Sequence, residues 1–303
     1  MSAVIRLDGV TCRLGGKEVV RDLSLEVPEG SIYAFLGPNG AGKTTTIKLI
    51  MGILRPSRGR IEVLGCESNQ LGPREKGQIG YVSENQQLPM WMRVEEFLDY
   101  CRPFYPTWDE GFCQALLTQF NLPRRRKLKA LSRGMLGKVA LISSLSYRPS
   151  LLMLDEPFSG LDPLVRDEFI RGVLELIEQE KWTVFISSHD MGEVERLCDR
   201  VGIIAHGQLL VNDSVAALQD RVRGVTFLKD GFMPPLTGFP PGWMNVESSG
   251  RLIRFVHGNC DENKLAEEIR QVAPGAEGME ARRLGLREIF LAYARAHRME
   301  ETG

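Results

Sequence analysis

The stretch GPNGAGKTTT, residues 37–46, constrains the fold of this chain more than any other feature of the sequence. It matches G-x-x-x-x-G-K-[ST], a pattern in which glycines let backbone N–H groups turn toward a phosphate. The apolar segment SIYAFL (31–36) precedes it and predicts a short buried strand. The segment TTTIKLIMGIL (44–54) follows it, and its apolar residues at helical spacing predict a helix. This order predicts an α/β fold in which the helix N-terminus faces an anion.

We expect the loop to bind the phosphates of a purine nucleoside triphosphate. Lys43 supplies a positive charge, and Thr44 offers its hydroxyl to Mg²⁺. The binding residues expected in the loop and the first helical turn are Asn39, Gly40, Ala41, Gly42, Lys43, Thr44 and Thr45. The alternative is a glycine-rich turn without a ligand, and the flanking strand and helix favour the phosphate site.

Two more apolar segments end in polar residues. LLMLDEP (151–157) predicts a buried parallel strand, whose carboxyl end opens on a ligand crevice. Asp155 would bind Mg²⁺ there, and Glu156 would polarise the water that attacks the γ-phosphate. In isolation Glu156 would be interpreted as a surface carboxylate. A third segment, WTVFISSH (182–189), ends in His189, and three such strand ends favour one shared active site.

Charge and composition narrow the function. Lys and Arg number 38 against 39 Asp and Glu, so the net charge of -1 provides no basic field, and we expect no nucleic-acid partner. No apolar stretch approaches the ~20 residues that cross a bilayer, and the first residues lack a signal-peptide core. We therefore expect a cytosolic chain that reaches a membrane through a partner. The six cysteines form no C-x-x-C pair, which favours structural thiols over a metal site.

Two further stretches complete a pattern, LSRGM at 131–135 and SGLD at 159–162. With the phosphate loop, the acidic strand end and the terminal histidine, they make residues 4–218 resemble the ATP-binding subunit of an ABC transporter. Five motifs occur in the order that this family shows.

The resemblance implies a P-loop NTPase fold of the ABC ATPase type. This fold has a mixed sheet core and a helical subdomain, here with a small C-terminal α+β accessory domain. We place the ATPase domain at residues 1–218, with the helical subdomain at about 86–148. The accessory domain then occupies residues 219–303.

The resemblance also implies how the chain works. In this family two ATPase domains pair head to tail, and the positions of Ser132 and Gly134 in one domain close over the γ-phosphate held by the other. Both residues precede a helix, which presents N–H groups and a hydroxyl to an anion. The simpler interpretation of Ser132 is a helix cap, and it can serve as both. ATP and Mg²⁺ are the implied ligands. A separate transmembrane permease would hold the chain at the cytoplasmic face of the cell membrane.

The chain departs from the family pattern in the Leu-Ser-Gly-Gly-Gln motif and in the Q-loop. Arg133 replaces the first glycine, and Met135 replaces the glutamine. Glu84 stands at the glutamine position of the Q-loop, where a carboxylate can still contact Mg²⁺ or water. We therefore expect Glu84 as a catalytic and metal-contacting residue, with Gln86 and Gln87 as alternatives close behind it.

A third departure concerns the base. The family commonly places an aromatic residue on adenine 23 positions before the first loop glycine, and here that position is Leu14. Leu14 can pack on the base by apolar contact alone. The first two departures resemble variants of these motifs in the ATPases of exporters whose permease is a separate chain. This resemblance favours export over import.

The segment between the Q-loop and LSRGM predicts helices at 92–105 and 110–120, with turns at Pro106 and Pro123. In the family this subdomain receives a coupling helix of the permease. LPMWM at 88–92 has a composition suited to such docking, and filling of the subdomain core is an equal alternative. RRRK at 124–127 is interpreted as a solvated charge run, with contact to anionic lipid headgroups as an alternative.

The last part of the chain changes in composition after VGIIAHGQLLV (201–211), which predicts an antiparallel hairpin around His206 and Gly207. The Pro- and Gly-rich segment 232–243 predicts no regular element. Strands are predicted at 225–228 and 251–258, and amphipathic helices at 261–273 and 286–298. No catalytic pattern occurs there, so this domain is expected to dimerise, to regulate, or to contact the permease.

The resulting hypothesis is an ATP-hydrolysing subunit that dimerises on ATP, as a homodimer or a heterodimer, and drives a separate permease, with export favoured. One alternative is a soluble ABC ATPase that remodels nucleic acid or ribosomes. Against it, Lys43 and Ser132 lie only 89 residues apart, too close for an intervening long coiled coil, and the chain has a single ATPase unit. The nearer alternative is an importer ATPase.

Overall fold

The computed structural model describes residues 2–300 except 85, 181, 191, 193, 194, 196 and 230–238. The chain divides into two compact units, Met1–Asn212 and Asp213–Gly303. The sequence places this boundary a little later, after residue 218. The structure assigns the short helix α8 (Val215–Arg221) to the second unit.

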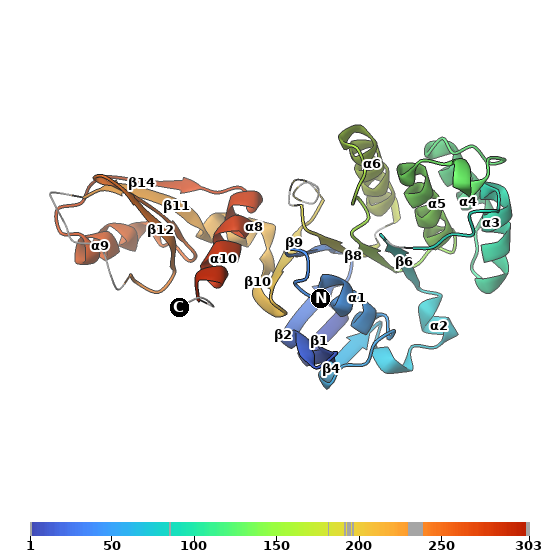
Figure 1. Ribbon diagram of the computed structural model, residues 1–303, viewed down its shortest axis with the longest axis horizontal. Helices are drawn as coiled ribbons and strands as arrows, with labels where there is room; N and C mark the ends of the chain where they lie inside the picture. Colours follow the sequence, from blue (N-terminus) through green and yellow to red (C-terminus); the bar gives the residue numbers. More distant parts are fainter. Residues whose placement is uncertain are drawn as a thin grey trace. The chain divides into compact units, whose positions relative to one another are not determined.

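A six-stranded sheet forms the centre of the first unit, in the order β10-β9-β3-β8-β7-β6. The pairs β3–β8, β3–β9, β7–β8 and β6–β7 are parallel. The strands are β3 (Ile32–Leu36), β6 (Ile79–Ser83), β7 (Leu151–Asp155), β8 (Thr183–Ser188), β9 (Arg200–Ala205) and β10 (Gln208–Ser214). Figure 1 labels β6, β8, β9 and β10 of this sheet. The near-continuous apolar strands at 31–36, 151–155 and 183–188 are typical of a sheet buried on both faces.

The carboxyl ends of the parallel strands lie level with one another. Leu36 pairs with Ser188, and Asp155 lies between Ser83 and Ser187. The three strand ends predicted from sequence therefore meet at one edge of the sheet, where ligands of open α/β sheets bind.

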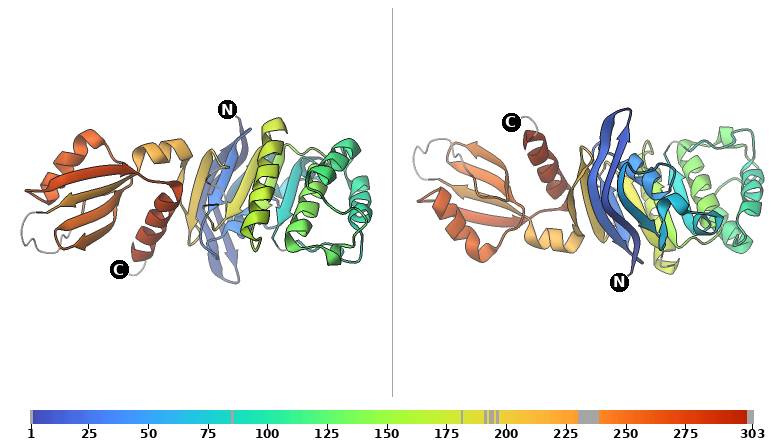
Figure 2. Two further views of the ribbon diagram at one scale, coloured as in Figure 1. Left: turned by 90° about the horizontal axis from the view of Figure 1, so that it is seen from above. Right: turned by 90° about the horizontal axis from the view of Figure 1, so that it is seen from below.

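A second, antiparallel sheet has the order β2-β1-β4-β5. Its strands are β1 (Ala3–Leu14), β2 (Lys17–Pro28), β4 (Arg58–Val63) and β5 (Cys66–Glu67). Figure 2 shows β1 and β2 as a long hairpin, coloured blue. Helix α1 (Lys43–Ile50) contacts both sheets, and Ile47 and Ile50 are fully buried in a core that also contains residues of both. The helix that follows the phosphate loop is thus fixed between two sheets.

The helical subdomain follows β6. It contains α3 (Val94–Cys101), α4 (Glu110–Gln119) and α5 (Arg133–Leu145), which Figures 1 and 2 show gathered together. The short elements around these helices are η1 (Ser68–Gln70), α2 (Pro73–Lys76), η2 (Arg102–Phe104) and η3 (Leu128–Ala130). The long helix α6 (Pro163–Glu180) packs against α5. In the described residues no helix is long and apolar enough to cross a bilayer.

The second unit is an antiparallel sheet in the order β12-β13-β11-β14 with helices. Its elements after α8 are β11 (Arg223–Leu228), β12 (Trp243–Ser249), β13 (Leu252–His257), α9 (Glu262–Val272), β14 (Glu277–Arg283) and α10 (Leu286–Glu300). Leu265 and Ile269 of α9 pack with Phe227, Trp243 and Phe255 of the sheet. This small core and the mixed sheets of the first unit confirm the predicted fold class.

Three features differ from the sequence prediction. Helix α1 ends at Ile50 rather than at residue 54, because Gly52 has φ 66° and a Cβ there would lie 2.1 Å from the Ser68 carbonyl oxygen. The segment 232–243 was predicted to contain no regular element, but Trp243 begins β12; residues 232–238 lie outside the described residues. The strand at 277–283 was not predicted, because its EGMEARR sequence is charged and almost wholly exposed.

Candidate functional site

The phosphate loop leaves β3 and enters α1 at Lys43. Gly42 has φ 108°, and a Cβ there would lie 2.8 Å from the Val19 carbonyl oxygen. At Gly37 a Cβ would lie 2.3 Å from the carbonyl oxygen of Ile204. Both positions therefore require glycine. Gly42 needs it for its positive φ and for space, and Gly37 needs it for space alone. Asn39, Gly40 and Thr44 are exposed, whereas Ala41 and Gly42 are buried, so the loop presents one accessible side.

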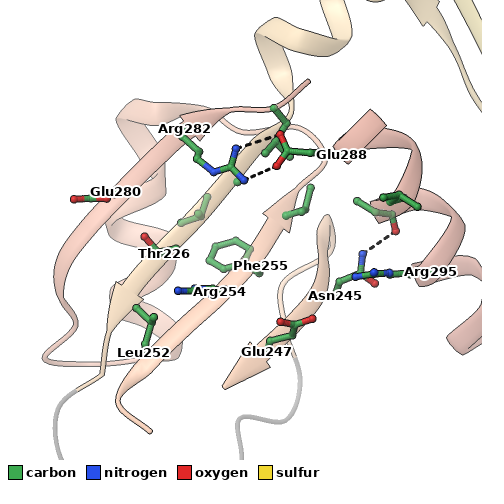
Figure 3. A pocket seen from close by; sticks show the side chains of 16 residues that line it. Thr226, Asn245, Glu247, Leu252, Arg254, Phe255, Glu280, Arg282, Glu288 and Arg295 are labelled. Atoms are coloured by element: carbon green, nitrogen blue, oxygen red, sulfur yellow. Dashed lines mark hydrogen bonds and ion pairs between the residues drawn. The ribbon is translucent and has the colours of Figure 1, made fainter. Parts of the chain in front are cut away.

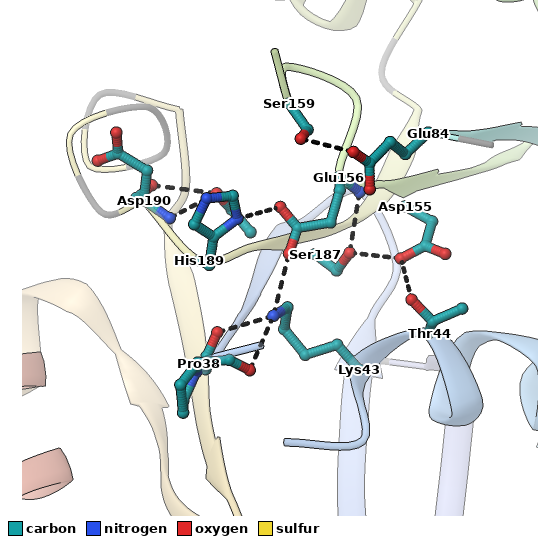
Figure 4. A network of polar contacts seen from close by, with 12 residues as sticks. Pro38, Lys43, Thr44, Glu84, Asp155, Glu156, Ser159, Ser187, His189 and Asp190 are labelled. Carbon is teal, nitrogen blue, oxygen red and sulfur yellow. Dashed lines mark hydrogen bonds and ion pairs between the residues drawn. The ribbon is translucent and has the colours of Figure 1, made fainter. Parts of the chain in front are cut away.

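The Lys43 side chain folds back over the loop and is only 5% exposed. Its Nζ donates to the carbonyl oxygens of Gly37, at 2.7 Å, and Pro38, at 3.2 Å. The same Nζ lies 3.0 Å from Oε1 of Glu156, whose side chain is 9% exposed. A buried cation is thus paired with a buried carboxylate at the mouth of the loop (Figure 4).

Asp155 is buried at the end of β7 and receives two hydrogen bonds on Oδ1. Thr44 Oγ1 donates to it at 3.1 Å and Ser187 Oγ at 2.8 Å. Burial raises the pKa of Asp155, the neighbouring Glu156 raises it further, and the Ser187 and Thr44 hydrogen bonds act in the opposite direction. A cation bound beside Asp155 would favour the ionised carboxylate and offset the free-energy cost of burying its charge.

Glu156 follows with φ 51°, in the left-handed region. Its backbone N–H donates to Ser187 Oγ at 3.0 Å. Its Oε2 lies 2.7 Å from Nδ1 of His189, so the carboxylate bridges Lys43 and His189 (Figure 4). The three residues come from the loop helix and from two adjacent strand ends, as the level register predicts.

Glu84 lies just beyond β6 and is fixed differently from the other carboxylates. Its backbone N–H donates to the Asp155 carbonyl oxygen at 2.9 Å. Its side-chain Oε1 accepts from Ser159 Oγ at 2.7 Å and from Arg133 Nη2 at 3.0 Å. Gln86, the sequence alternative, is exposed, and its backbone N–H donates to the Ser83 carbonyl oxygen at 3.1 Å.

Ser132 caps α5, and its Oγ accepts from the Met135 N–H at 3.3 Å. It is exposed, whereas Gly134 is buried, and a Cβ at Gly134 would lie 2.5 Å from Cγ1 of Val165. In the described part of the chain no hydrogen bond or ion pair connects Ser132 or Gly134 to the phosphate loop. The binding role of these two residues stays a prediction that concerns a second chain.

Leu14 ends β1 and pairs with Lys17 across the hairpin turn. Its side chain is 42% exposed, which leaves it accessible to a ligand. Thr45, the last predicted loop residue, is partly buried within α1. The binding roles of Leu14 and Thr45 also stay predictions.

The arrangement suits a nucleotide with Mg²⁺. Mg²⁺ typically binds one or two protein oxygens together with substrate phosphates. The Thr44 hydroxyl and the Asp155 carboxylate, joined by a hydrogen bond of 3.1 Å, provide two such oxygens beside the loop. Glu84 shows a poorer fit to this role, since the Arg133 guanidinium at 3.0 Å already balances the charge of its carboxylate.

Two serines of the site were not identified from sequence. Ser187 joins Asp155 to the Glu156 backbone, and Ser159 binds Glu84. The only sequence signal for Ser187 was its place in a segment already predicted to end at the site. Serines in strands and turns are too common for composition to single them out.

The second unit contains a separate cavity of 660 Å³ on the face of its sheet and beside α10 (Figure 3). Its lining mixes both charges, with Arg254, Arg282 and Glu247 among them. Arg282 Nη2 pairs with Oε1 of Glu288 at 2.6 Å. The described residues that line this cavity include no histidine or cysteine.

Comparison with known proteins identifies the family. Residues 20–159 match the sequence profile described as ABC transporter. An uncharacterized ABC transporter ATP-binding protein of Synechocystis sp. is 36% identical, covering 71% of this chain and 62% of its own. One of Bacillus subtilis is 35% identical, covering 69% of each chain. The bacitracin transport ATP-binding protein BcrA of Bacillus licheniformis is 34% identical, again covering 69% of each.

Solved structures agree on the fold. The ATP-binding subunit of an ABC transporter superposes with a TM-score of 0.64 at 29% identity, covering 72% of this chain and 92% of that one. A bacterial ABC transporter cassette solved as a dimer gives a TM-score of 0.61 at 22% identity, covering 69% and 98%. The chain thus belongs to the ATP-binding proteins of ABC transporters.

Proposed function

We propose that this protein binds and hydrolyses ATP with Mg²⁺, pairs with a second ATPase domain, and drives export through a separate transmembrane permease. The observation that carries the proposal is the Lys43–Glu156–His189 arrangement at the mouth of the phosphate loop. Lys43 Nζ lies 3.0 Å from one oxygen of the buried Glu156 carboxylate, and His189 Nδ1 lies 2.7 Å from the other. A purely structural turn would not need these three groups together.

Hydrolysis follows from what these side chains can do. Phosphoryl transfer needs positioning and charge compensation more than covalent chemistry. Lys43 leaves Glu156 to bind the phosphates, and the freed carboxylate then orients a water and accepts its proton. His189, hydrogen-bonded to Glu156 through Nδ1, holds the carboxylate in place. Mg²⁺, held by Thr44 and Asp155, supplies charge compensation at the phosphate oxygens when it is bound.

Pairing with a second ATPase domain would complete the site. Ser132 is exposed at the start of α5, and the helix dipole favours negative charge there. The cassette solved as a dimer, which has the same fold, provides a precedent for such pairing. Because one chain contains both the loop and the Ser132 region, a homodimer with two sites satisfies the proposal.

The helical subdomain supplies the surface for a permease. Trp91 and Phe104 are 69% and 64% exposed, and Met90 and Tyr100 are exposed as well. Within the LPMWM stretch, Met90 and Trp91 therefore do not fill the subdomain core, whereas Leu88 and Met92 are partly buried. Apolar surface of this kind is typical of a docking site. A permease bound here would hold the protein at the cytoplasmic face of the membrane. The similarity to the bacitracin transport protein favours export.

Affinity purification tests the proposal. Tagged Glu156→Gln protein would be isolated with ATP from detergent-solubilised membranes of the native cells, with Lys43→Ala as the control that cannot hold ATP. We expect a polytopic membrane protein in stoichiometric amount. Ribosomal proteins or nucleic acid without a membrane protein would overturn the transport function, and an extracytoplasmic binding protein in the same complex would indicate import.

A further inference from the structure

We propose that Glu84 is a positioning residue that fixes Arg133, and through Arg133 the start of α5, to the carboxylate strand β7. This inference rests on the proposed function, because the start of α5 is the part expected to meet a second chain's nucleotide. It replaces the expectation that Glu84 contacts Mg²⁺ or water directly. Both residues are departures from the family pattern described above, and the structure pairs them with each other.

Three contacts determine where Glu84 lies. Its backbone N–H is bound to the Asp155 carbonyl oxygen at 2.9 Å, which ties it to the strand that carries the catalytic carboxylates. Its Oε1 accepts from Ser159, at 2.7 Å, in the turn after Glu156. The same oxygen accepts from Arg133 Nη2 at 3.0 Å. The carboxylate therefore connects three segments that are far apart in sequence (Ser159 and Glu84 are drawn in Figure 4).

Arg133 occupies a space that the chain keeps open for it. Gly160 has φ 68°, and a Cβ there would lie 2.4 Å from Arg133 Nη1 and 2.7 Å from Cζ. The guanidinium thus lies over the Gly160 backbone while it binds Glu84. A cavity of 120 Å³ beside it is lined by Glu84, Arg133, Ser159 and Glu156, among others. The pair borders the space next to the proposed general base without contacting it.

The arrangement explains how a carboxylate is tolerated beside a phosphate site. A lone Glu84 would repel the γ-phosphate, whereas the Arg133 guanidinium balances its charge. Because Ser132 directly precedes Arg133 and caps α5, the pair also determines the position of that cap relative to Asp155 and Glu156. Ion pairs this exposed add little to global stability, so the effect is expected in positioning rather than in unfolding.

A double-mutant cycle tests the pair. The variants are Glu84→Gln, Arg133→Gln and the double variant. A matched cycle uses Glu67→Gln and Arg60→Gln, a pair at 2.9 Å with similar exposure, outside the site. We expect each site variant to lower kcat about fivefold, with the double variant no worse than either single. The KM for ATP and the Mg²⁺ dependence stay unchanged, because the phosphate loop is intact. Arg133→Lys, which keeps the charge, should recover part of kcat.

A second readout needs no ATP hydrolysis. Amide hydrogen exchange at residues 133–137 of the nucleotide-free protein should rise in Glu84→Gln only when Arg133 is present. Additive effects in both readouts would overturn the proposal. A loss of Mg²⁺ affinity in Glu84→Gln that persists with Gln at position 133 would assign Glu84 to the metal instead. If the wild-type protein hydrolyses no ATP but the effect of Glu84→Gln on amide exchange still depends on Arg133, the proposed ATPase function is wrong. The positioning of Arg133 by Glu84 is then still supported.

Discussion

Glu156→Gln should separate ATP binding from ATP hydrolysis in this protein. The Lys43 ammonium is paired with the Glu156 carboxylate at 3.0 Å, and both side chains are almost fully buried. Lys43 must give up this partner before it can bind phosphate. The carboxylate is therefore expected to oppose nucleotide binding, although the proposed mechanism requires it for the chemistry that follows.

The structure gives a magnitude for this competition. At 3.0 Å and an effective dielectric constant of about 20, the direct attraction is about 5 kcal/mol. Desolvation offsets most of it, and a hydrogen bond to a charged group has a net value of about 1.5–3 kcal/mol. The amide oxygen of glutamine still accepts a hydrogen bond from Lys43, so we expect Glu156→Gln to weaken the contact at Lys43 by about 1.4 kcal/mol. ATP then competes with a weaker partner for Lys43 and should bind about tenfold more tightly. Turnover should fall by about 10²–10⁴, the usual contribution of a general base.

Two assays on the same preparation check these numbers. Equilibrium titration with a fluorescent ATP analogue gives Kd, and phosphate release gives kcat. Glu26→Gln, which breaks the exposed Arg6–Glu26 pair at 2.8 Å, should change neither value. Undiminished turnover would refute the catalytic assignment of Glu156. Weaker or unchanged ATP binding would refute the competition between Glu156 and phosphate for Lys43.

Three further outcomes follow from the structure. Lys43→Ala should abolish ATP retention in the same titration, and unchanged affinity would contradict its role. Asp155→Asn should raise the free energy of unfolding of the nucleotide-free protein at pH 7, because burial raises the pKa of Asp155 and its ionised form therefore destabilises the fold. Urea unfolding should show that the difference in stability between Asp155→Asn and wild type disappears as pH falls through the ordinary Asp range. A difference that stays constant with pH would contradict the role of Asp155 ionisation. Trp243→Ala removes a ring stacked on Phe255 at 3.8 Å and should destabilise the C-terminal unit by about 3–5 kcal/mol, seen as lost amide protection in residues 239–298.

The sequence predicted the elements that depend on local pattern. The apolar runs before residues 37, 155 and 189 are long enough to identify buried strands, and the glycine loop fixes the helix that follows. The parallel register then requires that the carboxyl ends of these strands meet at one edge of the sheet. The sequence alone therefore predicts that Asp155, Glu156 and His189 lie together.

The parts that were missed depend on contacts between distant segments. Ser187 lies inside a predicted strand and Ser159 begins the SGLD stretch, but only the fold shows that they bind Asp155 and Glu84. Arg133 and Glu84 were identified as departures, but no spacing rule joins residues 49 positions apart. The strand β14 was missed because an exposed edge strand has no buried face to produce an alternating pattern.

The left-handed backbone at Glu156 has a geometric consequence for the whole site. Neighbouring residues in a strand direct their side chains to opposite faces of a sheet. Asp155 and Glu156 are neighbours, yet one reaches Thr44 and the other Lys43, which are themselves adjacent on α1. The φ of 51° turns the chain out of its strand at this residue and cancels the alternation. Two consecutive acids can thereby serve one nucleotide, and a β-branched residue, which resists this conformation, would separate them.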